Sequence, residues 1–161
     1  MTNITTFDME VVTSRTPRAF VEALFERIDV PTDDAQTLAG ITEITTEHFD
    51  ISTFDGARDA ISAELGIEPT VFIQFRPKPS LATDIIAVKR LITAVDKWLH
   101  DIGNDVVLVF NGESVMMFRK DGVLKLNEAS RGWTDARRSL ITYDYTVVTM
   151  PALRDATGSD I

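Results

Sequence analysis

An apolar stripe with helical spacing runs through residues 81–102 and is the most regular pattern in the chain. Its members recur every three or four positions: Leu81, Ile85, Val88, Ile92, Val95, Leu99 and Ile102. The opposite face is charged, with Asp84, Lys89, Asp96, Lys97 and Asp101. Gly103 follows as a stop signal. A coiled-coil seam would need a longer run of heptads. The stripe therefore predicts a long helix that packs on a sheet.

A second helix is predicted in residues 16–28, TPRAFVEALFERI. Thr16 suits the N-cap, and Pro17 suits the first helical position because its missing N–H needs no partner there. One face of this helix is apolar, with Phe20, Val21, Leu24, Phe25 and Ile28. Before it, residues 7–12 alternate between apolar and acidic side chains, which predicts a half-buried strand.

The most strongly patterned apolar segment predicts three consecutive strands, at residues 106–110, 114–119 and 123–127. Asn111-Gly112 is the strongest short signal for a hairpin turn, because both central residues of that turn need positive φ. Lys120-Asp121-Gly122 supplies the second turn. Hairpins therefore dominate the second half of the chain.

The same pattern makes a prediction for Met116 and Met117. Successive side chains of a strand point to opposite faces, so we expect at most one of the two in the core. Two further strands are predicted, one at 71–75, ended near Pro77, and one at 140–149.

Three segments leave alternatives open. Residues 40–55 are rich in Thr, Ile and Phe, but their alternation breaks, which indicates either a bulged strand or a hairpin near 45–48. Residues 57–65 predict a short helix that ends at Gly66. The break after Val30 is followed by a short segment through Leu38 that is compatible with one helical turn.

Strands and helices are mixed without regular alternation, which predicts an α+β sandwich. We expect a mostly antiparallel sheet with the two main helices packed on one face. A single domain is expected over residues 1–153, with a frayed tail at 154–161.

Composition narrows the function classes. There is no cysteine, which excludes disulfides, thiolate catalysis and Cys-based metal sites. The net charge of −9 disfavours nucleic-acid binding. It would speed encounter with a basic partner, although an acidic surface equally serves solubility. Neither a secretory signal nor an apolar run near the ~20 residues of a membrane span is present, so we expect a soluble, cytoplasmic protein.

His48 and Asp50 form the one acid–base fragment worth weighing. If they lie in one strand, both point to the same face as Ser52. Because Phe49 and Ile51 occupy the other face, the solvated side of an amphipathic strand explains the pattern more simply. His100, on the polar face of the long helix, is interpreted as a surface residue.

Other candidate chemistry is equally sparse. Three acidic pairs match no metal-binding spacing: Asp33 with Asp34, Glu43 with Glu47, and Asp55 with Asp59. The glycine-rich phosphate motifs and the nucleophile elbow are missing from the sequence. Arg131, Trp133, Arg137 and Arg138 form a basic and aromatic patch, for which a loop anchored by Trp133 is favoured over an anion site. We therefore expect no catalytic residues, no cofactor and no metal, and an enzyme is disfavoured.

Four stretches of the chain resemble the SitI-type swarm-inhibition immunity proteins of bacterial kin-discrimination toxin systems. They are FDMEVVTSRTPRAFVEAL, GITEITTEHFDIS, ELGIEPTVFIQFRPKP and DVVLVFNGESVMMFRKDGVLKLNE. They are similar to that family's opening strand and helix, its Thr-rich strand, its strand ending in Phe-Arg, and its closing meander with an Arg and a Gly turn. The likeness covers about residues 6–150 in the same order.

This resemblance implies a small cytoplasmic antitoxin that binds a cognate toxin, and it brings no catalytic residues. An acidic inhibitor suits a basic toxin, because complementary fields raise association rates. We take Glu43, Glu47 and Asp50 as candidates for the contact. Two alternatives stay open: a generic protein-interaction module and a hydrolase that uses His48 and Asp50.

Overall fold

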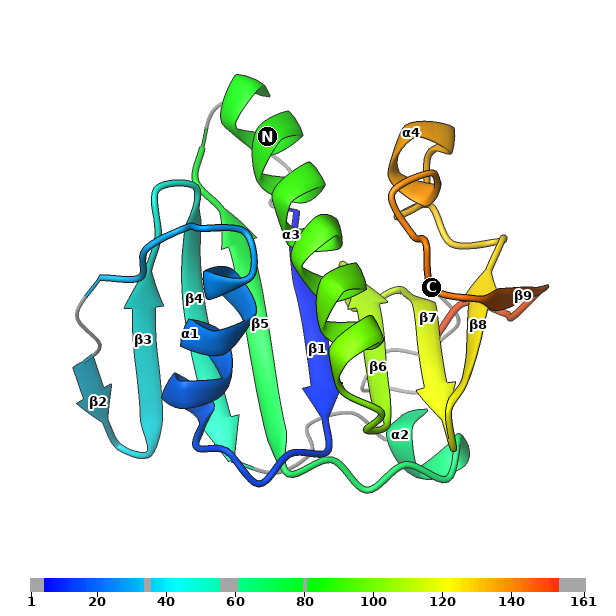
Figure 1. The fold of residues 1–161 in the computed structure, drawn as a ribbon, viewed down its shortest axis with the longest axis horizontal. Helices are drawn as coiled ribbons and strands as arrows, with labels where there is room; N and C mark the ends of the chain where they lie inside the picture. Colours follow the sequence, from blue (N-terminus) through cyan, green and yellow to red (C-terminus); the bar gives the residue numbers. More distant parts are fainter. Residues whose placement is uncertain (1–4, 34–35, 56–60, 80, 154–161) are drawn as a thin grey trace.

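One nine-stranded sheet organises the residues that the structure describes (Figure 1). The computed structural model describes residues 5–33, 36–55, 61–79 and 81–153. Along the chain the elements are β1 (Phe7–Val11), α1 (Pro17–Glu26), β2 (Gln36–Leu38), β3 (Ile41–Thr45), β4 (Phe49–Asp55), α2 (Ile61–Glu64), β5 (Val71–Pro77), α3 (Leu81–Asp101), β6 (Val106–Phe110), β7 (Ser114–Lys120), β8 (Val123–Asn127), α4 (Asp135–Arg138) and β9 (Tyr145–Val148). The strand order is β2-β3-β4-β5-β1-β6-β7-β8-β9.

The sheet is mostly antiparallel, as the sequence predicts. Only the β8–β9 pair is parallel among the described strands. The predicted α+β class is therefore confirmed. None of the described helices is long and apolar enough to cross a bilayer.

The strand β1 lies at the centre of the sheet, between β5 and β6. The alternation of residues 7–12 predicts a half-buried strand, and this is wrong because all five residues of β1 are buried. Its apolar residues face the main core, whereas Glu10 faces the other side and accepts a hydrogen bond from the Ser62 hydroxyl of α2. The acidic positions of β1 therefore belong to a second covered face and not to a solvated one.

Helices α1 and α3 lie against the same face of the sheet as the apolar residues of β1 (Figure 1). Thr16 caps α1 as predicted, because its hydroxyl accepts the N–H of Ala19 at 3.2 Å. Helix α3 matches the predicted long helix, and its stripe is buried at Val88, Ile92, Val95 and Leu99. The predicted apolar stripe is not buried near the N-terminal end of α3, where Ile85 is 66% exposed. The first turns of α3 project past the strands there (Figure 1).

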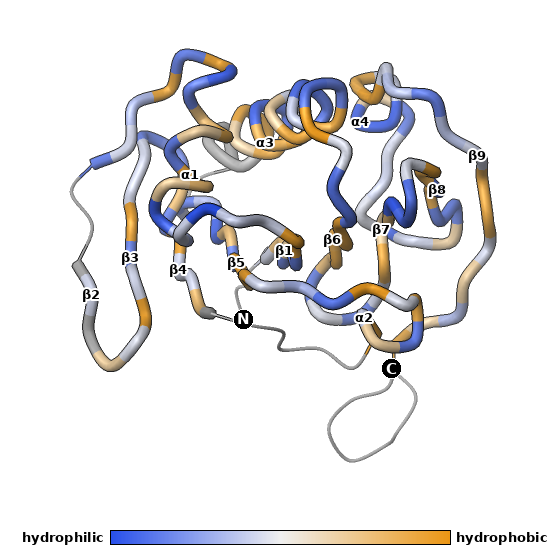
Figure 2. Tube along the Cα trace, turned by 60° about the horizontal axis from the view of Figure 1, so that its bottom comes forward, coloured by the Kyte–Doolittle hydropathy of each residue, from blue (hydrophilic) through white to orange (hydrophobic). Residues whose placement is uncertain are grey.

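The opposite face of the sheet has its own smaller core at β6 and β7. Figure 2 shows α2 on the side of these strands away from α3. Its buried members are Ile67, Val107, Val109, Val115 and Phe118. Helix α2 packs there through Ile61, with Leu65 just after it, and Gly66 follows at φ +74°. The predicted short helix is thus present over Ile61–Glu64. Residues 57–60 of that prediction, and the predicted tail at 154–161, lie outside the described residues.

Both predicted hairpin turns of the 106–127 segment are confirmed. Asn111 and Gly112 have φ of 53° and 66°, and Asp121 and Gly122 have φ of 51° and 82°. The prediction for the two methionines is wrong, because Met116 and Met117 are both buried in the main core. The register of β6 against β7 jumps between Leu108 and Val109. The strand β7 therefore carries an extra residue, and a bulge of this kind turns two successive side chains to one face.

Glycine at position 132 makes room for this bulge. A Cβ added there would lie 2.7 Å from the Met116 sulfur. The indole N–H of Trp133 then donates to the Met116 carbonyl at 2.8 Å. The loop after β8 is therefore packed against the bulge.

The open alternatives of the first half are settled by the hydrogen-bond ladder. Residues 40–55 form a hairpin, with Thr42 opposite Thr53 and Thr45 opposite Asp50. This pairing excludes the bulged-strand alternative for residues 40–55.

The helical turn allowed through Leu38 is wrong, because Gln36–Leu38 is the short strand β2, paired with β3.

The strand predicted at 140–149 is shorter and differently paired than expected. Only Tyr145–Val148 is strand, and it runs parallel to β8. A parallel partner cannot follow directly by a tight turn. The connection instead passes through α4, whose N-cap is Thr134, within the segment predicted as a loop.

The placement of α3 predicts the cost of shortening its apolar stripe. Ile92→Ala should lower the free energy of unfolding by about 2–5 kcal/mol, because Ile92 is fully buried. The matched control Ile85→Ala should change it by less than about 0.5 kcal/mol, because that side chain is largely exposed. Urea unfolding followed by circular dichroism measures both, and equal losses would contradict the placement.

Candidate functional site

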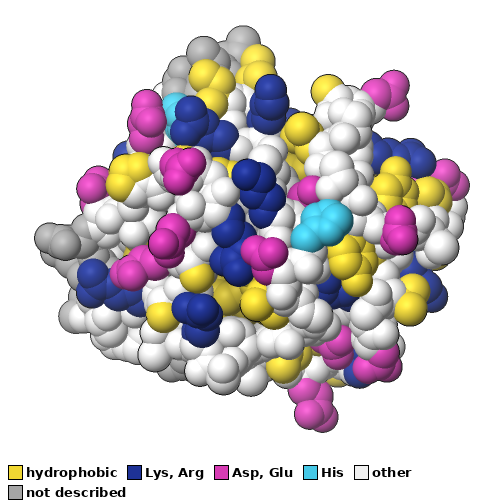
Figure 3. Space-filling view, viewed as in Figure 1, with side chains coloured by type: hydrophobic (Ala, Val, Ile, Leu, Met, Phe, Trp, Pro, Cys, Tyr) yellow, Lys and Arg dark blue, Asp and Glu magenta, His cyan; other side chains and the backbone are white. Residues whose placement is uncertain are grey.

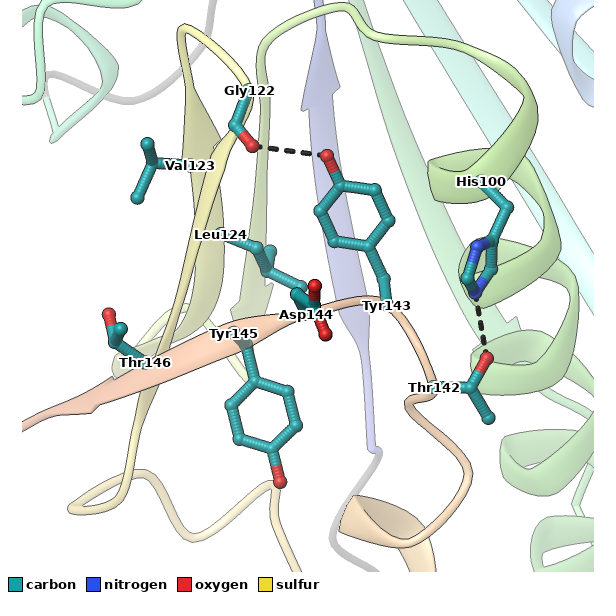
Figure 4. A pocket seen from close by; sticks show the side chains of 9 residues that line it. All are labelled: His100, Gly122, Val123, Leu124, Thr142, Tyr143, Asp144, Tyr145 and Thr146. Atoms are coloured by element: carbon teal, nitrogen blue, oxygen red, sulfur yellow. Dashed lines mark hydrogen bonds between the residues drawn. The ribbon is translucent and has the colours of Figure 1, made fainter.

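A cleft of about 530 Å³ opens between the C-terminal half of α3 and the strands β8 and β9 (Figure 4). Its walls are His100 of α3, the turn and strand residues 122–124, and the segment 142–146. The last segment enters β9, which is the end strand of the described sheet. The cleft therefore brings together parts of the chain that are far apart in sequence.

Asp96 fixes one wall of the cleft to α3. It is only 6% exposed, although the sequence predicts it on the solvated face of the helix. Its carboxylate accepts the backbone N–H groups of Thr142 at 2.8 Å and Tyr143 at 3.1 Å, and the Thr142 hydroxyl at 2.7 Å. The buried charge is thus satisfied by three donors from a segment that otherwise lacks regular structure.

His100, Thr142 and Asp96 form a chain that superficially resembles a nucleophile with its base. His100 Nε2 lies 2.7 Å from Thr142 Oγ1. The single hydroxyl proton of Thr142 is directed to Asp96, so His100 Nε2 is the donor in this contact. An activated hydroxyl would need the opposite direction, with the imidazole accepting its proton. The chain therefore positions the 142–146 segment and has no nucleophilic arrangement.

Arg119 of β7 lies behind the same wall and is fully buried. Its guanidinium donates to the carbonyl of Leu99 at 2.7 Å, to that of Asn104 at 2.8 Å, and to that of Ile102. These carbonyls end α3 and follow it, where the helix itself supplies no donors. The same guanidinium lies 5.2 Å from the ring centres of Trp98 and Tyr143.

Burial lowers the pKa of Arg119, because an apolar environment disfavours its charged form. An arginine nevertheless remains protonated in proteins. The negative end of the α3 dipole and the two ring faces stabilise the cation that burial disfavours. Arg119 is therefore the cap of α3 and the support of Tyr143.

The sequence-predicted contact residues lie elsewhere, on the β3–β4 hairpin. Glu43 is exposed, and Asp50 is half-buried opposite Arg76 in the ladder. Both alternate with the buried Ile44 and Ile51, so they share the face of the hairpin that points away from the main core. Glu47 lies in the turn, with its side chain 72% exposed. The structure therefore gathers the three acidic residues on one hairpin.

The hydrolase fragment His48 and Asp50 is not assembled in the way the sequence allows. His48 lies in the turn before β4, so strand alternation does not place it beside Asp50. Its Nε2 is 3.8 Å from a carboxylate oxygen of Glu47. Within the described residues, no group of three or more His, Asp or Glu side chains could hold a metal ion.

The basic and aromatic patch is taken up by internal contacts. Arg137 donates to the Gly132 carbonyl at 2.9 Å, and Arg131 pairs with Glu113 at 3.0 Å. Trp133 anchors the loop through Met116. The interpretation of this segment as an anchored loop fits these contacts better than an anion site.

Sequence reasoning missed the cleft altogether. Its walls depend on hydrogen bonds between Asp96 and residues 46 and 47 positions away in the sequence, which no local pattern encodes. The single available signal was Asp144, a charge that interrupts an otherwise β-branched and aromatic segment.

The hydrogen bonds of Asp96 tether the cleft wall to α3, and they predict which of two variants loses more stability. Asp96→Ala should lower the free energy of unfolding by at least about 2 kcal/mol, because buried donors lose their acceptor. His100→Ala should cost less than about 1 kcal/mol, because its side chain is half exposed and donates a single neutral bond. Urea titration measures both, and the reverse order would contradict the tether.

The cap made by Arg119 predicts that lysine cannot replace it. Arg119→Lys should lower the free energy of unfolding by at least about 2 kcal/mol, because one ammonium cannot reach all three carbonyls. The control Arg131→Lys should stay within about 0.5 kcal/mol of the parent, since Arg131 is 81% exposed. A stable Arg119→Lys protein would show that the cap is dispensable.

Comparison with known proteins gives one family. The model described as SitI3-like matches residues 5–137. No curated protein and no solved structure matches the chain. The matched range ends inside α4, so β9 and the 142–146 wall of the cleft lie beyond it.

Proposed function

The chain belongs to the SitI3-like family, and we propose that it is an immunity protein that neutralises a cognate bacterial toxin in the cytoplasm by direct contact. The observation that carries this proposal is the family match over most of the chain. The geometry supports it indirectly, because in the His100–Thr142–Asp96 chain the Thr142 hydroxyl donates to Asp96 and is not activated by His100.

We further propose that the toxin is basic and approaches the acidic β3–β4 hairpin. The chain carries a net charge of −9. The face covered by α1 and α3 mixes basic and acidic side chains, so the acidic excess forms no continuous patch there (Figure 3). On the hairpin, Glu43 and Glu47 are exposed, whereas Asp50 has Arg76 as its cross-strand neighbour. Glu43 and Glu47 are therefore the stronger candidates and Asp50 the weaker one.

Affinity purification from the native host tests the function itself. With the tagged chain as bait, we expect to recover a toxic protein that copurifies in a stable complex. A bait that recovers no toxic protein from cells shown to produce one would contradict the proposal. Such a negative result would favour the generic interaction module.

Charge reversal tests the hairpin once that toxin is in hand. Glu43→Lys with Glu47→Lys should lower the association rate by at least about tenfold at low salt, with a smaller effect at high salt, because steering is screened. The control Glu64→Lys with Glu68→Lys changes the net charge equally on exposed residues near α2. Surface plasmon resonance measures both, and equal rates for the two double variants would exclude the hairpin.

A further inference from the structure

We propose that the cleft between α3 and β8–β9 binds a basic side chain, arginine or lysine, of the partner toxin and helps the chain to select that toxin. This inference rests on the proposed function and adds a second contact surface to it.

Three of the polar hydrogens at the cleft are already committed inside the protein. The Tyr143 hydroxyl donates to the Gly122 carbonyl at 3.0 Å. The Thr142 hydroxyl donates to Asp96, and the ring N–H of His100 donates to Thr142 (Figure 4). For a ligand that needs several donors, such as a carboxylate or a phosphate, the hydroxyls of Tyr145 and Thr146 are the main side-chain donors that remain among the lining residues.

The cleft also offers a ligand an acceptor and aromatic faces. Asp144 is exposed, and its side chain makes no hydrogen bond or ion pair within the part of the chain that the structure describes. It lines the cleft together with Tyr143 and Tyr145 (Figure 4). A cleft that holds one carboxylate and tyrosine rings suits a guanidinium or an ammonium, which can gain both an ion pair and contact with a ring face.

The charge of the cleft points the same way. Asp144 is the only lining residue with a formal charge at neutral pH, when His100 is counted as neutral. The nearby cation, Arg119, is fully buried and occupied by the carbonyls at the end of α3. A basic side chain would therefore enter a site of net negative charge on a protein of net charge −9.

The position of the cleft fits a role in choosing a partner. One wall, residues 142–146, lies beyond the range matched by the family model. An immunity protein must favour one toxin over its relatives, and specificity of this kind is a difference in affinity between partners. A contact built from a segment outside the family pattern can differ between members without disturbing the shared fold.

Nuclear magnetic resonance titration with N-acetyl-arginine amide tests the cleft without a toxin. We expect saturable shifts at the backbone amides of residues 143–146, and N-acetyl-citrulline amide, a neutral isostere, should bind at least about tenfold more weakly. Asp144→Asn should weaken the arginine probe severalfold. The control Asp135→Asn removes an exposed carboxylate on α4 outside the cleft and should leave binding unchanged.

Several results would overturn this assignment: no shifts with the arginine probe, equal binding of the citrulline probe, or equal effects of the two Asn variants. With the purified toxin, Asp144→Asn should also weaken the complex, and an unchanged complex would exclude the cleft as a toxin contact. Binding of the arginine probe by a chain that recovers no toxin would instead contradict the proposed function and leave the chemistry of the cleft intact.

Discussion

The buried guanidinium of Arg119 connects three parts of the molecule that are separate in the sequence: β7, the end of α3 and the wall of the cleft. It extends from β7, donates to the carbonyls at the end of α3, and stacks between Trp98 of α3 and Tyr143 of the cleft wall. Removing a charged group from water costs several kcal/mol unless the surroundings compensate. Here the helix terminus supplies acceptors that would otherwise lack donors. A planar group with five N–H donors can serve them together, which a single ammonium cannot do.

The cleft follows from this arrangement. With the end of α3 fixed against β7, Asp96 and His100 face the segment that returns to β9, and Asp96 holds that segment through its backbone. Tyr143 is then fixed on two sides, by Arg119 against its ring and by the Gly122 carbonyl at its hydroxyl. Asp144 is left exposed at the cleft. The binding chemistry that we propose is thus a consequence of how one helix end is capped.

Local patterns predicted most elements, because turns, caps and amphipathic faces are encoded by neighbouring residues. Asn111-Gly112 and Asp121-Gly122 adopt positive φ wherever the strands around them pair, and Thr16 caps α1 through a contact three residues away. The features that local patterns do not predict depend on residues that are distant in the sequence. Nothing near Met116 announces the bulge, whose cause is the pairing with β6 and the space left by Gly132. The acidic residues of β1 looked solvated because the layer beneath them comes from other parts of the chain.

The candidate sites show the same division. Glu43, Glu47 and Asp50 are candidates because they are acidic and the family resemblance implies an inhibitor of a toxin, and their shared hairpin is a fact of the fold that leaves their role a prediction. The cleft could not be predicted, since Asp96 reads as a solvated helix residue until its partners in the 142–146 segment are known.

The family membership, the acidic hairpin and the cleft support our proposal that the protein inhibits a toxin by binding to it. Co-expression in a sensitive bacterium tests this claim most directly. Cells that produce the recovered toxin should grow when this chain is produced with it and should die when the chain is absent. The account would be contradicted if the toxin killed cells equally in both cases while the chain accumulated in its folded form.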